Sequence, residues 1–190
     1  MKYSTSFRIW HWLNALVILG LIGTVLLRKT FLSWRTNSEL ITHELSKIDI
    51  NITSEQAKVI AKALRVGMWE WHIILGYALA ALVIFRIYLH FKDTSKKESF
   101  DSLNIHKKIV RISYYVIYAT ILFMSVSGFT IYFYETLGLT KELAHSIKDI
   151  HELVYNVILY FVPLHIIGVF IAENRDEKGI VSTMINGEKN

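Results

Sequence analysis

The stretch HELVYNVILYFVPLHIIGVFIA, residues 151–172, decides the fold that we predict for this chain. From residue 153 to residue 172 it contains no Asp, Glu, Lys or Arg. About 20 predominantly apolar residues are the length that an α-helix needs to cross the hydrocarbon core of a membrane. Two histidines, His151 and His165, lie at the start of the stretch and within it. The first prediction is therefore a membrane-spanning helix that carries two imidazole groups.

Three further stretches have the same character, at about residues 9–27, 71–91 and 112–134. The first and third contain no charged residue, and the second contains only Arg86. Backbone polar groups in lipid must be satisfied within the segment, so each stretch is expected to be helical. Burial inside a soluble protein is the alternative, but the rest of the chain is too short to cover four such helices. We predict an all-α integral membrane protein with one domain, residues 1–190, and a bundle of four transmembrane helices.

The composition supports this class. Hydrophobic residues make up 53% of the 190 residues and charged residues 19%, and the mean hydropathy is +0.35. These values exclude an intrinsically disordered chain, which requires low hydrophobicity. The absence of cysteine excludes disulfides, cysteine-bound zinc or iron–sulfur clusters, and haem linked through thioether bonds.

The basic residues predict the orientation of the chain. The first span follows two basic residues, as in a signal peptide, but it is longer than the apolar region of a typical signal peptide and no clear cleavage pattern follows it. Lys and Arg concentrate on the cytoplasmic side of membrane proteins. Both termini and the short second connection are therefore expected in the cytoplasm. The residues that support this are Lys2, Arg8, Lys92, Lys96, Lys97, Lys107, Lys108, Arg175, Lys178 and Lys189.

The long first connection is also basic, but it contains acidic residues as well. Thr53 and Gln56 match a capping box, the pairing that begins many helices. Apolar residues then follow at helical spacing, which predicts one short amphipathic helix. This helix either lies on the membrane surface or forms a docking surface for a partner. Its apolar positions are Ala57, Ile60, Ala61, Leu64 and Met68.

The histidines within the spans indicate the chemistry, because polar groups at membrane depth are costly and usually functional. His151 and His165 are fourteen residues apart, so they lie within about 40° of one helix face and about 21 Å apart along its axis. Successive spans alternate in direction. His11 therefore lies at the same membrane side as His165, and His72 at the same side as His151.

Two opposed imidazoles in an apolar bundle can hold a haem iron from both faces. Zinc would require three or four ligands at each site, whereas each layer offers two histidines. We therefore predict two b haems with four metal ligands, His11, His72, His151 and His165. Arg86 lies fourteen residues after His72 and either binds the propionates of the inner haem or extends its charge to the interface. The alternative without haem is a membrane anchor or small transporter that uses these histidines for helix contacts or proton relay.

The ordered motifs of the chain resemble those of prokaryotic di-haem cytochromes b, such as bacterial cytochrome b-561 and the cytochrome b subunits of nickel–iron hydrogenases. The resemblance covers nearly the whole chain. One departure is the first connection, about residues 28–68, which is longer than in compact members. The matching stretches are Arg8-Ile9-Trp10-His11-Trp12, His72-Ile73-Ile74-Leu75-Gly76 with Phe85-Arg86, Ser127-Gly128, His151 with His165-Ile166-Ile167-Gly168, and the Met-Ile-x-Gly stretch that ends at Gly187.

The resemblance implies an electron carrier of the bacterial inner membrane with haem ligands at His11, His72, His151 and His165, which exchanges electrons with the quinone pool. The expected partners are membrane lipid, quinone or quinol, and a redox subunit of dehydrogenase or hydrogenase type, with no nucleic acid. Some family members act alone as oxidoreductases, for example as superoxide:quinone oxidoreductases. The basic first connection is compatible with a small anion as well as an acidic partner. Whether the chain is itself an enzyme therefore stays open, as do its donor and quinone.

Overall fold

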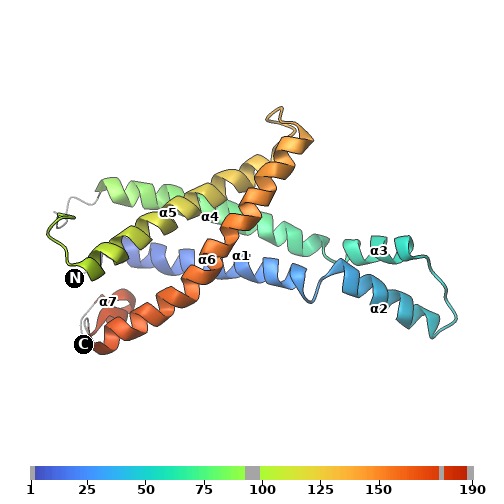
Figure 1. Cartoon of the computed structure of the whole chain (residues 1–190), viewed down its shortest axis with the longest axis horizontal. Helices are drawn as coiled ribbons and strands as arrows, with labels where there is room; N and C mark the ends of the chain where they lie inside the picture. The colour runs from blue at the N-terminus through green and yellow to red at the C-terminus, as the bar shows by residue number, and fades with distance from the viewer. Residues whose placement is uncertain (1–2, 93–98, 176–177, 188–190) are drawn as a thin grey trace. The chain divides into compact units, whose positions relative to one another are not determined.

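The computed structural model describes residues 3–92, 99–175 and 178–187, and this part of the chain is helical throughout apart from turns and connections (Figure 1). Four of the basic residues used to predict the orientation, Lys2, Lys96, Lys97 and Lys189, lie outside the described residues. The helices are α1 (Thr5–Lys29), α2 (Trp34–Ser46), α3 (Ser54–Ala63), α4 (Val66–Lys92), α5 (Ile105–Tyr132), α6 (Lys141–Arg175) and α7 (Ile180–Ile185).

Within the described residues, four helical stretches are long and apolar enough to cross a membrane, and they contain α1, α4, α5 and α6. This confirms the prediction of an all-helical fold with four spans. The predicted spans fall inside α1, α4 and α6, which all extend beyond them. The predicted third span, about residues 112–134, extends two residues beyond its helix, because α5 ends at Tyr132 and Phe133 is its C-cap. With 25 residues, α1 is the shortest of the four helices, and at 1.5 Å per residue it is about 37 Å long.

Contacts divide the chain into two compact units whose boundaries fall inside α1 and α4. Unit 1 comprises Met1–Asn14 with Leu79–Asn190, and unit 2 comprises Ala15–Ala78. In unit 1, α5 packs against α6, and the buried residues of these two helices include Ile117, Ile121, Tyr155 and Ile158. The start of α1 is tied to α4 within this unit, because the indole N–H of Trp10 donates to the Leu82 carbonyl at 2.8 Å.

The first connection forms two helices in unit 2, where the sequence predicted one. The capping box is confirmed, since Thr53 and Gln56 each bond the other's backbone N–H at the start of α3. However, α3 ends at Ala63, so Met68 belongs to α4. The polar helix α2 was missed, and it packs beside α3 (Figure 1). Ala57 and Ala61 are completely buried on α3, because small side chains allow close helix approach.

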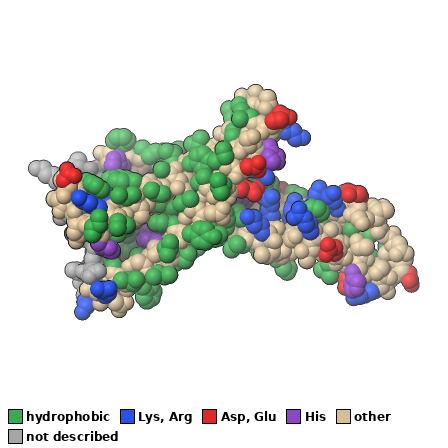
Figure 2. Space-filling view, viewed as in Figure 1, with side chains coloured by type: hydrophobic (Ala, Val, Ile, Leu, Met, Phe, Trp, Pro, Cys, Tyr) green, Lys and Arg blue, Asp and Glu red, His purple; other side chains and the backbone are tan. Residues whose placement is uncertain are grey.

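The surface of the long helices is apolar, while polar side chains lie among the buried residues. Figure 2 shows hydrophobic side chains over α5 and α6, and charged side chains gathered over α2 and α3. On α6, for example, Tyr160, Leu164 and Phe170 are each more than 60% exposed. Such a surface is unsuited to water but fits contact with lipid. The buried polar residues are Asn14, Thr24, Thr120, Ser125, Ser127 and Thr183.

Candidate functional site

The imidazole rings of His11 on α1 and His165 on α6 lie next to each other in unit 1. Their ring centroids are 6.3 Å apart and the rings are inclined by 55°. A metal–imidazole bond is about 2.0 Å and the ring centroid lies roughly 1 Å behind the bonding nitrogen, so two imidazoles on opposite sides of one iron have centroids about 6 Å apart. The observed separation therefore fits one iron between the two rings.

Aromatic rings border this pair. Trp12 lies edge-on to His11 with the centroids 5.2 Å apart, and Phe161 stacks on His165 at 5.6 Å. Within the described part of the chain, the buried Nδ1 of His11 has no hydrogen-bond partner. The two rings thus sit in an apolar setting of the kind that holds a porphyrin.

Arg86 on α4 lies close to this layer, because it contacts Trp10, the residue directly before His11 on α1. Its guanidinium carbon is 5.0–5.4 Å from the rings of Phe7, Trp10 and Tyr118, a distance at which a cation is attracted to each ring face. One terminal nitrogen donates to the Tyr118 hydroxyl at 3.4 Å. The buried Nε has no partner among the described residues. Arg86 is therefore held by aromatic side chains of the bundle and has donor capacity left for an anionic group.

The C-terminal helix α7 is fixed beside His11. Arg8 donates to the Ile185 carbonyl at 2.9 Å, and Trp12 donates to the Met184 carbonyl at 3.2 Å. The Glu173 carboxylate, at the end of α6, accepts the backbone N–H groups of Gly179 and Val181. These hydrogen bonds hold α7 against the first turns of α1, where His11 lies.

His151 on α6 is hydrogen-bonded to a hydroxyl of α5. Its Nδ1 lies 2.7 Å from Ser127 Oγ, and the Ser127 hydroxyl also lies 2.7 Å from the Phe123 carbonyl oxygen. A Cβ added at Gly128 would lie 3.6 Å from the Cε1 of His151. The Ser127-Gly128 pair thus supplies a polar contact and an open space beside the imidazole.

His72 on α4 has the same arrangement within unit 2. Its Nδ1 lies 2.8 Å from Thr24 Oγ1 on α1, and that hydroxyl is 2.7 Å from the Leu21 carbonyl oxygen. The indole of Trp69 stacks on the imidazole, with centroids 5.1 Å apart and an angle of 3°. The Arg28 guanidinium lies 5.3 Å from the Trp69 ring. His72 and His151 belong to different units, so the structure describes the surroundings of each one separately.

The exposure of the eight histidines separates them into two groups. His11, His72, His151 and His165 are half-buried, although many apolar neighbours on the same helices are exposed. The remaining four are exposed: His43, His90, His106 and His145. Over the described ranges, no three His, Cys, Asp or Glu side chains converge as a metal site would require. The arrangement favours two-histidine ligation of a cofactor that supplies its own equatorial ligands.

The sequence did not predict the contacts of two residues with the histidines of this site. Thr24 was not singled out, and Ser127 was noted only as part of a small-residue pair. A hydroxyl in a membrane helix usually bonds a carbonyl of its own helix, so sequence alone gives no reason to connect either residue with a histidine. Each hydroxyl also lies on a different helix from its histidine, so no short sequence motif contains both partners.

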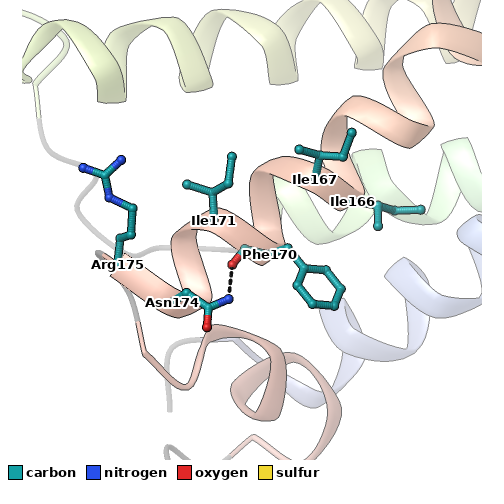
Figure 3. A pocket seen from close by; sticks show the side chains of 6 residues that line it. All are labelled: Ile166, Ile167, Phe170, Ile171, Asn174 and Arg175. Carbon is teal, nitrogen blue, oxygen red and sulfur yellow. Dashed lines mark hydrogen bonds between the residues drawn. The ribbon is translucent and has the colours of Figure 1, made fainter.

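A shallow apolar groove runs along α6 directly after His165. Its volume is about 350 Å³, and the polar residues Asn174 and Arg175 lie at one end (Figure 3). The Asn174 side chain donates to the Phe170 carbonyl at 2.7 Å. The remaining lining residues are Ile166, Ile167, Phe170 and Ile171.

The family model described as prokaryotic cytochrome b561 matches residues 2–187. Comparison with curated proteins gave no match, and neither did comparison with solved structures. The matched range covers almost the entire chain, and the chain therefore belongs to the prokaryotic cytochrome b561 family. This membership implies a multi-pass membrane protein that binds b-type haem and transfers electrons through it.

Proposed function

We propose that this member of the prokaryotic cytochrome b561 family holds two b haems and passes electrons across the bacterial inner membrane, between the quinone pool and a redox partner protein. His11 and His165 would hold the inner haem, and His72 and His151 the outer haem. A b haem, when bound, supplies a one-electron couple at its iron. The observation that carries the proposal is the pair of neighbouring imidazoles, His11 and His165, whose centroid separation fits two ligands of one iron.

The second pair follows from the direction of the helices. Consecutive spans cross the membrane in opposite directions, so α4 and α6 run the same way. His72 and His151 both lie in the first third of their helices, α4 and α6. Each also has a hydroxyl at its Nδ1, within 2.8 Å. This shared environment supports a common role for the two residues.

The chain's other contribution is to orient and screen the cofactor. Arg86, with an unused donor beside the His11 layer, is suited to bind the carboxylates of a haem. The apolar groove after His165 is suited to a quinone, whose ring and tail are apolar and whose carbonyl oxygens need polar contacts. Replacing Ile167 with Trp would fill this groove. Electron transfer to a short-chain quinone should then slow while the haem content stays unchanged.

A cluster of cations in the first connection supports a second candidate, a stand-alone superoxide:quinone oxidoreductase. Arg35, Lys58 and Lys62 all lie within 6 Å of the Trp34 ring centroid. Arg28, at the start of this connection, contacts the Trp69 ring, and the same ring stacks on His72. Positive charge at this end would attract a small anion, and equally an acidic partner protein. A superoxide-consumption assay on the purified protein, with and without quinone, distinguishes the two.

The haem content of histidine variants tests the proposed ligation. We expect about two haems per purified chain, and one haem after His11→Ala, His165→Ala, His72→Ala or His151→Ala. The double variant His11→Ala/His165→Ala should keep one haem, whereas His11→Ala/His72→Ala should keep none. His145→Ala, at an exposed position of α6, is the matched control and should keep both. Full haem content in all four single variants would overturn the assignment.

A further inference from the structure

Two buried hydroxyl groups contact the outer pair of histidines, and they come from different helices. Thr24 is 8% exposed and Ser127 is 4% exposed. Each hydroxyl lies between a histidine Nδ1 and a carbonyl oxygen of its own helix, with all four distances between 2.7 and 2.8 Å. The same arrangement thus occurs once in unit 2 and once in unit 1.

The position of the hydroxyl proton follows from these distances. Two oxygen atoms 2.7 Å apart require a proton between them, and a carbonyl oxygen cannot donate one. The single proton of each hydroxyl is therefore donated to the carbonyl, of Leu21 for Thr24 and of Phe123 for Ser127. The hydroxyl oxygen can then only accept from the imidazole, so His72 and His151 carry their proton on Nδ1. In a neutral imidazole this leaves the lone pair on Nε2.

We propose that Thr24 and Ser127 are positioning residues, which fix His72 and His151 in the tautomer that presents Nε2 to iron and lower the potential of the haem held by these histidines. The inference rests on the proposed ligation. An acceptor at Nδ1–H makes the imidazole a stronger electron donor, as partners of metal-bound histidines do in general. Stronger donation stabilises the ferric iron more than the ferrous iron. Removing the acceptor should consequently raise the potential of that haem.

In the layer of His11 and His165, at least one histidine lacks a hydroxyl partner of this kind within the described part of the chain. Among the described residues, the buried Nδ1 of His11 has no hydrogen-bond partner. The proposed effect is therefore confined to the layer of His72 and His151. The two haems should respond differently to loss of a hydroxyl.

Thr24→Val and Ser127→Ala, made in the full-length haem-loaded protein, test the inference. Two residues of the chain provide matched controls, because their hydroxyls bond a carbonyl four residues earlier and, among the described residues, bond no histidine. These are Ser125, buried on α5, and Thr30, directly after α1. The readout is the pair of midpoint potentials, obtained by redox titration followed in the visible spectrum.

We expect one of the two potentials to rise in Thr24→Val, and the same one to rise in Ser127→Ala. The ferric–ferrous equilibrium should shift severalfold, and a tenfold shift corresponds to about 59 mV for one electron. Thr24→Ser, which keeps the hydroxyl, should restore the original value. Ser125→Ala and Thr30→Val should leave both potentials unchanged.

Three results would overturn the inference: unchanged potentials, different haems responding to the two variants, or an equal response in the controls. If Thr24→Val binds haem too weakly to titrate, Ser127→Ala and Thr24→Ser still decide the outcome. Failure of the proposed function is distinguishable, because the unaltered protein would then lack two titrating haems.

Discussion

Replacement of Gly187 by alanine should detach the C-terminal helix α7 from the start of α1. Gly187 has a φ of +84°, and a Cβ at this position would lie 2.9 Å from the Cζ of Arg8. A left-handed backbone costs an L-residue about 1–2 kcal/mol. Arg8 would also have to move away from the Ile185 carbonyl, which loses a hydrogen bond of about 1 kcal/mol. The sum of about 2–3 kcal/mol corresponds to a roughly 30- to 150-fold change in the docking equilibrium of α7.

Spin labelling can measure this change, because the chain contains no cysteine and a single one can be introduced. Val181 on α7 is suited to the label, since it is 38% exposed. The label should be immobilised in the parent protein and mobile after Gly187→Ala. Gly138→Ala is the control, because Gly138 also has a positive φ but no atom within 4 Å of the added Cβ. An equally immobile label in Gly187→Ala would show that Arg8 does not hold α7 as described.

Two further predictions concern other parts of the chain. Arg86→Gln removes a positive charge beside the His11 layer and should lower the potential of the inner haem, while Arg86→Lys should lower it less. A redox titration measures both potentials, and an unchanged potential in Arg86→Gln would contradict a role of Arg86 near that haem. Ala61→Leu introduces a large side chain at a position of α3 with no exposed surface, so overpacking should weaken the α2–α3 contact by about 1–3 kcal/mol. Faster amide hydrogen exchange within α3 would reveal the loss, and Val59→Leu, which enlarges a side chain at an exposed position of α3, is the control that should not show it.

The sequence predicted the long helices because hydrophobic length is a strong physical constraint in a membrane. All four predicted spans coincide with helices of the structure, apart from the two residues after Tyr132. The connection was harder, because α2 is stabilised by packing against α3 and not by a continuous apolar face of its own. The alternating direction of the spans was sufficient to predict that His11 and His165 lie at the same level.

The hydroxyl contacts were not predictable for a different reason. Thr24 and Ser127 are ordinary residues for a membrane helix, and their importance depends on the rotation of one helix relative to another. Sequence periodicity defines a helix face but does not define what that face meets. The same limitation applies to Arg86, whose sequence position was compatible both with a role at the cofactor and with an extended side chain at the interface. The three aromatic rings around it become visible only once α1, α4 and α5 are placed together in unit 1.

The continuity of α6 has a mechanical consequence. His151 and His165 lie on a single helix without interruption, although Pro163 falls between them. Their axial separation is therefore set by fourteen residue steps of one continuous helix and is independent of the lengths of the loops. Inserting a single residue between them would turn one imidazole by about 100° away from its partner. Loop lengths can thus vary during evolution without altering the spacing of His151 and His165, whereas any insertion or deletion between them in α6 would change it.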